Sequence, residues 1–255
     1  MILKYKVLIV GLGSIGFLYD VNNKSKRTIL THAKSFDLDP RFELIGGVDV
    51  NNQIRNTFEK IYKKNSWSTL QEAIKIKNPD VIVISTPTND HFKTFKEIFQ
   101  YIQPKCILIE KPISYKFSET KNISEVLRKN KCKGYVNFFR SSLPSTQKIK
   151  SIITKNIIGK PIKGYFWYSK GIFNTGSHFI DLFRTFFGEV LEIRVLKKNQ
   201  IKDSDVNPDL YLKFRDADIY FIASNTDNFF YNQFELFGQK GKLVYQNGGA
   251  EIFWH

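Results

Sequence analysis

Cysteine is scarce in this sequence, because only Cys106 and Cys132 occur among its 255 residues. Each lies beside or within an apolar, strand-like run, and their spacing does not match that of metal ligands. A disulfide framework of the kind that stabilises small secreted proteins is therefore excluded, and no metal is expected. Two isolated thiols are typical of a protein that folds in a reducing cytoplasm.

The sequence also lacks an uninterrupted apolar run of the ~20 residues that a membrane-spanning helix requires. Its opening segment, MILKYKVLIVGLGSIGFLY, resembles a signal peptide in hydrophobicity, but three glycines interrupt it and no small-residue cleavage site follows. We interpret this segment as a strand followed by a helix. The sequence thus predicts a soluble, cytoplasmic protein with no membrane partner.

Acidic residues are few, since 24 Asp and Glu stand against 39 Lys and Arg, for a formal charge of +15. Such an excess favours a polyanionic partner. The basic residues are scattered, however, apart from a cluster at 24–27, and no helix or zinc motif for reading a nucleic-acid groove is present. Because Lys, Asn, Ile and Phe are all abundant, we interpret lysine as the default surface residue and expect no nucleic-acid partner.

The stretch that organises the chain is 6–16, where the apolar run KVLIV leads directly into GLGSIG. In a strand that enters a GxGxxG turn, Gly11 allows the tight turn, and Gly13 lets the backbone approach a pyrophosphate. Gly16 then lets the next helix pack closely, with the phosphate at the N-terminus of that helix. The pattern predicts a dinucleotide site; the alternative is a glycine-rich turn in another α/β protein.

A second strand over 42–48 ends at Asp49, where a Rossmann fold places the acid that binds the adenine ribose. Asp49 lies 33 residues after the last glycine of the motif, more than the ~20 of the standard fingerprint. A polar, basic stretch at 22–28, read as an inserted loop before a short helix at 31–36, accounts for the excess. The alternative is that Asp49 is an ordinary turn residue at a strand end.

Strands and helices alternate through the first half of the chain, which indicates a parallel sheet. Helical patterning covers 53–63 and 70–75, and the runs at 80–85 and 106–109 are continuously apolar, as strands covered on both faces require. Ligands of such sheets bind outside the carboxyl ends of the strands. The residues that fall at those ends are Gly11, Asp49, Thr86 and Lys111.

Motifs along nearly the whole chain carry a family resemblance. They are GLGSIG, Asp49, STPTNDH at 85–91, EKP at 110–112, YVNFFR at 135–140, GSHFIDL at 176–182 and FELFGQKG at 234–241. Together they resemble the Gfo/Idh/MocA family, named after glucose-fructose oxidoreductase and inositol dehydrogenase. EKP followed by a later HxxDL is the most specific part of this resemblance.

The resemblance implies a doubly wound Rossmann domain for NAD(P) at 1–115 and a second α/β domain at 116–255. The sheet of the second domain would be open, largely antiparallel and packed on another subunit. The sequence agrees independently, because 209–224 reads as two strands joined by a turn near 216–218. The run at 219–223 is apolar on both faces, which predicts a homo-oligomer.

The strand ends and the resemblance together define the expected cofactor contacts. They are Gly11, Gly13, Ser14, Ile15, Gly16, Asp49, Ser85, Thr86, Pro87, His91, Glu110 and Lys111. We expect NAD in preference to NADP, because the carboxylate of Asp49 would repel a 2′-phosphate and no Lys or Arg lies between positions 50 and 54. Arg55 is the residue that argues against this preference.

The predicted catalytic residues are Lys111, His178 and Asn174. His178 would carry the hydroxyl proton, Lys111 would bind the substrate oxygen and stabilise alkoxide character, and Asn174 would orient the hydroxyl. The alternatives are a helix histidine that holds a loop and a solvated lysine at a strand end.

Four other residues have lesser expected roles. Asp181 would tether backbone near the helix, His32 and His91 are structural or cofactor-edge residues, and Tyr168 is the next candidate for the proton carrier.

Two departures from the family pattern matter. The second domain is short, so it is expected to lack closing elements, and Asn174 stands where the family often has Asp. The favoured function is an NAD(P)-dependent dehydrogenase of carbohydrate metabolism that acts on a sugar, cyclitol, sugar phosphate or nucleotide sugar. The alternative is a non-catalytic dinucleotide-binding sensor or scaffold.

Overall fold

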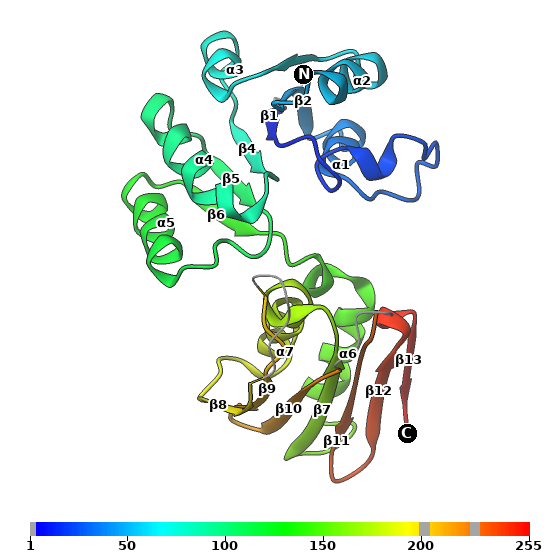
Figure 1. The fold of residues 1–255 in the computed structure, drawn as a ribbon. Coiled ribbons are helices and arrows are strands. Elements are labelled where there is room, and N and C mark those ends of the chain that lie inside the picture. The colour runs from blue at the N-terminus through cyan, green and yellow to red at the C-terminus, as the bar shows by residue number, and fades with distance from the viewer. Residues whose placement is uncertain (1–3, 199–204, 225–229) are drawn as a thin grey trace. The chain divides into compact units, whose positions relative to one another are not determined.

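The structure is a computed structural model that describes residues 4–198, 205–224 and 230–255. The chain forms two compact units, Met1–Asn137 and Phe138–His255. The first unit contains a six-stranded sheet and the second a seven-stranded sheet (Figure 1). The structure describes no helix that is both long and apolar enough to cross a bilayer.

The sheet of the first unit is entirely parallel, with the order β3-β2-β1-β4-β5-β6. Its strands are β1 (Tyr5–Val10), β2 (Phe42–Val48), β3 (Asn65–Trp67), β4 (Val81–Ile84), β5 (Cys106–Ile109) and β6 (Lys133–Val136). The helices are α1 (His32–Leu38), α2 (Asn52–Tyr62), α3 (Leu70–Ile76), α4 (Thr88–Tyr101) and α5 (Phe117–Lys129). This order and direction are those of a Rossmann fold.

Helices cover both faces of this sheet. Because side chains alternate along each strand, neighbouring residues of one strand pack into two different cores. Val7 and Ile9 of β1 pack with Phe58 of α2 in one core. Leu8 and Val10 pack in a second core with buried residues of α3, α4 and α5. The predicted doubly wound sheet is therefore confirmed.

Two details of the first unit differ from the sequence-based prediction. The turn after the glycines continues only into a short 3-10 helix, η1 (Leu18–Asp20), and α1 does not begin until His32. The side chain of Asp20, in η1, accepts hydrogen bonds from Asn23, Leu30 and Thr31 and so holds the inserted loop against the turn. The predicted boundary after residue 115 also differs from the division into compact units, which falls after Asn137, because β6 pairs with β5 in the first sheet.

The second unit contains a largely antiparallel sheet, as predicted, with the order β13-β12-β11-β7-β10-β9-β8. Only the central pair, β7 and β10, is parallel. The strands are β7 (Ile162–Tyr168), β8 (Glu192–Lys197), β9 (Asp209–Lys213), β10 (Ala217–Ala223), β11 (Asn232–Phe237), β12 (Lys242–Gln246) and β13 (Glu251–Trp254). The predicted hairpin at 209–224 corresponds to β9–β10, and the motif at 234–241 lies in the hairpin of β11 and β12.

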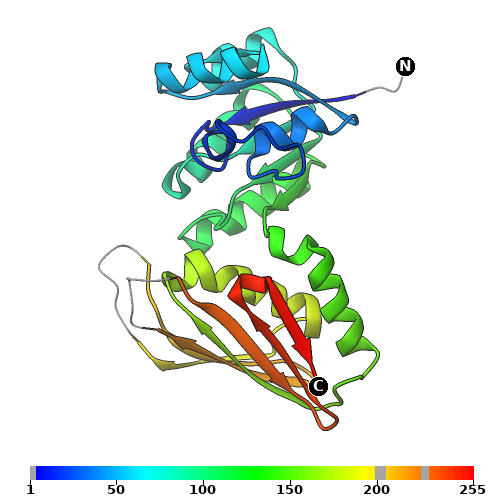
Figure 2. The same cartoon turned by 90° about the vertical axis from the view of Figure 1, so that its right-hand side faces the viewer.

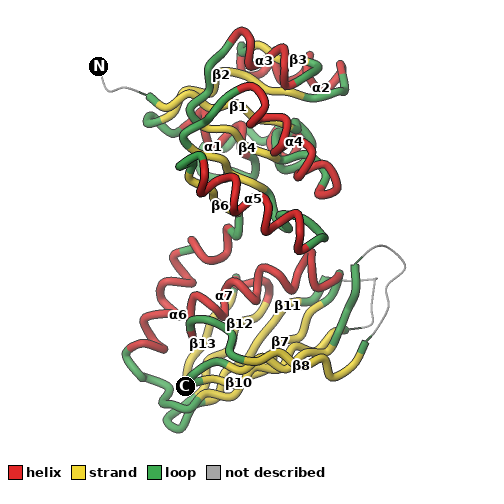
Figure 3. Tube along the Cα trace, turned by 90° about the vertical axis from the view of Figure 1, so that its left-hand side faces the viewer, coloured by secondary structure: helices red, strands yellow, loops and turns green. Residues whose placement is uncertain are grey.

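Helices α6 (Pro144–Thr154) and α7 (Ser177–Phe187) lie over one face of this sheet (Figures 2 and 3). Two short 3-10 helices, η2 (Phe139–Ser142) and η4 (Asn247–Gly249), and a π-helical segment, η3 (Gly171–Gly176), complete the unit. The core is aromatic: the ring of Phe166 stacks on Phe179 at 4.0 Å and meets the edge of Phe221 at 5.0 Å. These contacts pack α7 against β7 and β10.

Candidate functional site

At Gly11, the first glycine of the turn, neighbouring backbone leaves no room for a side chain. Gly11 has a φ of +95°, and a Cβ atom there would lie 2.6 Å from the backbone of Ser85 and of Thr86. A side chain is therefore excluded at position 11 both by conformation and by space. Gly16 is equally closed, because a Cβ atom there would collide with the carbonyl oxygen of Gly11.

Gly13 differs from both, because a Cβ atom at this position would meet no heavy atom within 4 Å. Among the described residues, no side chain or backbone atom therefore excludes a methyl group at this position. Gly13 borders a cavity, so the space beside it is open to a ligand. A glycine that the fold does not need, placed at a ligand cavity, fits close approach of a bound group to the backbone.

The carboxylate of Asp49, directly after β2, binds the backbone of the glycine turn. One oxygen accepts a hydrogen bond of 2.8 Å from the Leu12 N–H, and the other accepts one of 2.8 Å from the Asn51 N–H. Each oxygen of a carboxylate has two lone pairs, so one acceptor site remains on each for a ribose hydroxyl. Asp49 therefore both orders the glycine turn and keeps the capacity to bind a diol.

The cavity beside these residues has a volume of about 590 Å³ and lies at the carboxyl ends of β1, β2 and β4. Of the predicted cofactor contacts, it is lined by Gly11, Gly13, Asp49, Ser85, Thr86 and Pro87. The volume is in the range of small-molecule sites. Of the four residues predicted to converge at the strand ends, Gly11, Asp49 and Thr86 line this cavity and Lys111 does not.

Sequence reasoning missed one side of this cavity. It is also lined by Ser68, Thr69 and Leu70 from the start of α3 and by Asp90, Lys93, Thr94 and Glu97 from α4. The α4 residues are spaced three and four apart, so they share one helix face. This spacing was visible in the sequence, but which face of α4 meets the cavity is a consequence of packing.

Two polar features of this cavity are left for a ligand. The hydroxyl of Thr86 is buried and has no hydrogen-bond partner in the described parts of the chain. In the same parts, the N–H groups of Gly13, Ser14 and Ile15 bond to no backbone carbonyl, and the bonds of the turn begin with Phe17. A buried hydroxyl without a partner, such as that of Thr86, is uncommon in folded proteins. The residues present therefore fit an anionic dinucleotide.

Glu110 has a structural role in the described contacts. Its carboxylate accepts hydrogen bonds from His32 Nε2 at 2.7 Å and from Asn137 Nδ2 at 2.6 Å. Burial raises the pKa of this carboxyl, but the bonds from His32 and Asn137 outweigh it and hold the pKa below its ordinary value. Glu110 thus ties α1 and the end of β6 to the end of β5.

His91 is also engaged with the chain. It is 1% exposed; its Nε2 lies 2.8 Å from the Thr86 carbonyl oxygen, and its Nδ1 lies 3.1 Å from that of Pro112. It therefore joins the loop after β4 to the segment that follows Lys111. Lys111 itself is half-buried directly after β5.

The second unit places the other predicted catalytic residues on one continuous helical segment. Asn174 is exposed in η3, and His178 is 7% exposed in the first turn of α7. The rings of Phe138 and Phe139 meet the His178 ring edge-on at 5.8 and 5.2 Å. A π-helical turn such as η3 often marks a functional segment.

Two further residues of this unit have clear partners. The Ser141 hydroxyl donates to the Asp181 carboxylate, so Asp181 is a tether, although to a side chain rather than to backbone. Tyr168 is fully buried and donates to the Pro208 carbonyl oxygen at 2.6 Å. Burial raises its pKa far above the ordinary value. The prediction that Tyr168 is the next candidate for the proton carrier is therefore wrong.

Comparison with known proteins identifies related folds. Residues 5–138 match a family described as "Oxidoreductase family, NAD-binding Rossmann fold". A myo-inositol dehydrogenase from Corynebacterium glutamicum ATCC 13032 is 20% identical with a TM-score of 0.76, over 96% of this chain and 76% of that one. No curated protein matches the sequence.

Two structures solved with ligands are also similar. The WlbA dehydrogenase from Bordetella pertussis, in complex with NADH and UDP-GlcNAcA, is 17% identical with a TM-score of 0.78, over 98% of this chain and 80% of that one. GenD2 from gentamicin A biosynthesis, in complex with NAD, is 18% identical with a TM-score of 0.76, over 96% of this chain and 73% of that one. At these identities the likeness shows a shared fold.

The contrast between Gly11 and Gly13 predicts opposite effects of adding one methyl group. Gly13→Ala should leave thermal stability nearly unchanged but weaken NADH binding about tenfold or more, because the methyl group enters the open space. Gly11→Ala should lower the free energy of unfolding by about 2–4 kcal/mol through strain and collision. Thermal melts and NADH fluorescence titrations measure both. Equal NADH affinity of Gly13→Ala and wild type would contradict the assignment.

Proposed function

The chain belongs to the Gfo/Idh/MocA family of oxidoreductases, and we propose that it transfers a hydride between NAD(H) and a carbinol carbon of a sugar-type substrate. The observation that carries the proposal is the cavity at the carboxyl ends of β1, β2 and β4. There Gly13 adjoins open space, Asp49 keeps free lone pairs, and the hydroxyl of Thr86 is buried without a partner in the described chain.

The residues of this cavity have distinct roles in holding the dinucleotide. Asp49 accepts hydrogen bonds from the adenine ribose, the turn at Gly13 and Ser14 faces the pyrophosphate, and Thr86 donates its hydroxyl proton to the ligand. When bound, the nicotinamide supplies the site that takes or gives the hydride. Ser85 supports the turn by donating to the Gly11 carbonyl oxygen at 2.8 Å.

The substrate hydroxyl requires groups of the protein that move its proton. In our proposal His178 accepts this proton in oxidation and returns it in reduction, because imidazole titrates near neutral pH. Lys111 donates a hydrogen bond to the same oxygen and stabilises its developing negative charge. Asn174, one turn before His178, orients the hydroxyl as a hydrogen-bond donor or acceptor.

The substrate class rests on the family and on the proteins of similar fold. Their names include a myo-inositol dehydrogenase and a dehydrogenase solved with UDP-GlcNAcA, that is, a cyclitol and a nucleotide-sugar context. We therefore propose a sugar, cyclitol, sugar phosphate or nucleotide sugar as the substrate of this chain. The amide of Asn174 in place of a carboxylate supports the second candidate function, a non-catalytic dinucleotide sensor.

A turnover assay distinguishes the proposed enzyme from the non-catalytic sensor. The purified protein, loaded with NAD or NADH, is assayed at 340 nm against a panel of polyols, sugar phosphates and nucleotide sugars. The proposed enzyme turns over at least one class. Tight cofactor binding without turnover on any of them would favour the sensor.

Substitution of the catalytic pair tests the mechanism. Lys111→Ala and His178→Ala should each lower kcat by about 10²-fold or more, as expected for loss of an oxyanion donor or a general acid, while NADH affinity changes little. Asn174→Asp serves as the matched variant: it should alter the pH dependence of kcat and leave the need for His178 intact. Near-normal turnover of His178→Ala on a confirmed substrate would overturn this mechanism.

We propose NAD as the preferred cofactor, because Asp49 would repel a 2′-phosphate. The guanidinium of Arg55 is engaged, since it donates to the carbonyl oxygens of Asp49 at 2.8 Å and Val50 at 3.1 Å and to the Asn52 side chain at 2.9 Å. It is therefore not poised as a dedicated phosphate ligand.

Cofactor titrations test this preference. Asp49→Ala should narrow the ratio of NADPH to NADH dissociation constants by about tenfold or more, because it removes a like-charge contact. Arg55→Gln should leave that ratio nearly unchanged. A wild-type protein that binds NADPH more tightly than NADH refutes the proposal.

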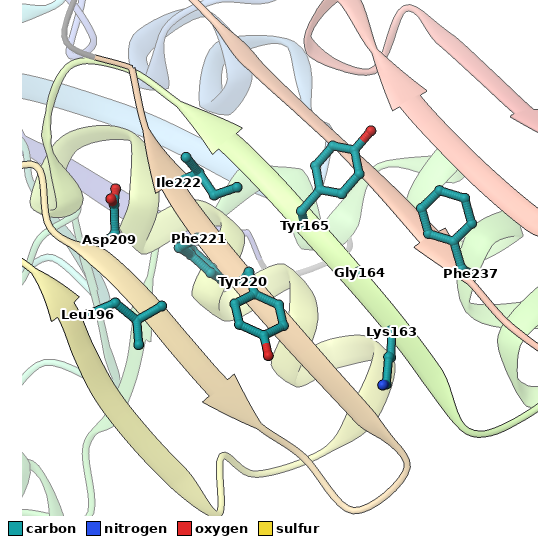
Figure 4. Close-up of a pocket in the computed structure, with 9 residues that line it drawn as sticks. All are labelled: Lys163, Gly164, Tyr165, Leu196, Asp209, Tyr220, Phe221, Ile222 and Phe237. Atoms are coloured by element: carbon teal, nitrogen blue, oxygen red, sulfur yellow. The ribbon is translucent and has the colours of Figure 1, made fainter.

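We also propose that the chain forms a homo-oligomer through the outer face of the second sheet. Strand β10 covers the core with one face and exposes the other: Ile219 and Phe221 are fully buried, whereas Tyr220 is 43% exposed. Figure 4 shows Tyr165, Tyr220 and Phe237 on this face, where they border a cavity of about 510 Å³. Aromatic residues are enriched in the centres of protein interfaces.

A charge on this face should break the oligomer. Light scattering should give a mass above the 29.8 kDa of one chain for wild type, and a monomer mass for the double variant Tyr220→Glu and Phe237→Glu. Phe117→Glu, at an 83% exposed aromatic residue of α5, is the control and should keep the wild-type mass. A wild-type monomer at micromolar concentration would contradict this proposal.

A further inference from the structure

A second cavity lies at the opposite, amino edge of the Rossmann sheet. Its wall contains the first residue of five adjacent strands: Tyr5, Phe42, Val81, Cys106 and Lys133. Because parallel strands all begin at one edge, these side chains meet at the end remote from the dinucleotide cavity. The volume is about 570 Å³, which is the size of a small-molecule site.

The walls of this amino-edge cavity are aromatic. The ring of Phe42 lies 5.0 Å from that of Phe36 in an edge-to-face contact and 6.2 Å from that of Tyr5. Tyr5 and Tyr135 are half-exposed, with 48% and 56% of their surfaces accessible. Rings arranged in this way favour a flat apolar body, whereas the hydroxyls of a sugar would lose hydrogen bonds to water without replacement.

The charge at the cavity is positive. Lys105 is neutralised, since its ammonium lies 2.8 Å from the Asp80 carboxylate. Lys131 and Lys133 also line the cavity, and neither forms an ion pair with a carboxylate in the described parts of the chain. Lys131 adopts a left-handed backbone conformation, with a φ of 52°, just after α5. Two ammonium groups beside an apolar wall attract an anion with an apolar body.

We propose that this amino-edge cavity binds an aromatic carboxylate, with its ring among Tyr5, Phe42 and Tyr135 and its carboxylate on Lys131 and Lys133. The site is separate from the dinucleotide cavity and does not depend on the proposed reaction. It makes the Rossmann unit a receptor for a second small molecule. The ligand chemistry also distinguishes the two sites, because a sugar substrate lacks the apolar body and a dinucleotide carries a more polar surface.

Cys106 lies in the wall of the cavity, so its rate of alkylation reports whether a ligand occupies the cavity. Cys106 is partly buried; burial raises the pKa of its thiol, and nearby Lys133 partly offsets that rise. Cys132 is buried, and burial raises its pKa to about 11. Since the thiolate is the reactive form, iodoacetamide at pH 8 should modify Cys106 far faster than Cys132. Peptide mass spectrometry separates the two sites.

The experiment measures the rate of Cys106 alkylation in the full chain with 2-naphthoate as the probe. Protection should saturate and reach on the order of tenfold at ten times the dissociation constant. Saturating NADH, inorganic phosphate and uncharged 2-naphthalenemethanol should each protect much less. The double variant Lys131→Gln and Lys133→Gln should lose most of the protection by 2-naphthoate while its NADH affinity stays unchanged.

Two outcomes would overturn the proposal. One is an unchanged rate at Cys106 with 2-naphthoate up to millimolar concentration. The other is equal protection in wild type and in the double variant, which would mean that the lysines do not bind the carboxylate. Lys4→Gln with Lys60→Gln, at two exposed lysines that do not line the cavity, controls for loss of net charge and should keep the wild-type protection.

Discussion

The first unit depends on the close approach of three strand ends at Gly11. The Gly11 N–H donates to the Val48 carbonyl oxygen at 2.8 Å, and the Ser85 hydroxyl donates to the Gly11 carbonyl oxygen at 2.8 Å. A Cβ atom at Gly11 would lie 2.6 Å from the backbone of Ser85 and Thr86, directly after β4. Because the ends of β1, β2 and β4 are locked together here, Asp49 and Thr86 are placed on the same cavity as the glycine turn.

The second unit depends on a different constraint, the separation of two faces on one sheet. Phe166 and Phe221 point inward and pack on α7, so Tyr165 and Tyr220, their neighbours in sequence, point outward. The inward aromatic contacts position the helix that begins with Ser177 and His178. The same alternation leaves aromatic rings on the outer face, so helix placement and the proposed oligomer surface have one physical origin.

The sequence predicted those features that short-range patterns determine. The glycine turn, the strand end at Asp49 and the hairpin of β9 and β10 each follow from spacing and alternation over a few residues. The early boundary and the absent helix after Gly16 did not, because α5, β6 and the contacts of Asp20 are decided by packing and by partners distant in sequence. Glu110, His91 and Tyr168 belong to the same group, since only folding shows that their polar atoms already have partners.

The central claim is that a dinucleotide binds across the ends of β1, β2 and β4, and a crystal structure of the chain with NAD tests it most directly. We expect density for the adenine ribose within hydrogen-bond distance of Asp49 and for the pyrophosphate beside Gly13. The Thr86 hydroxyl should then have a partner on the ligand. Density for NAD at another surface, with this cavity empty at saturating NAD, would contradict the account.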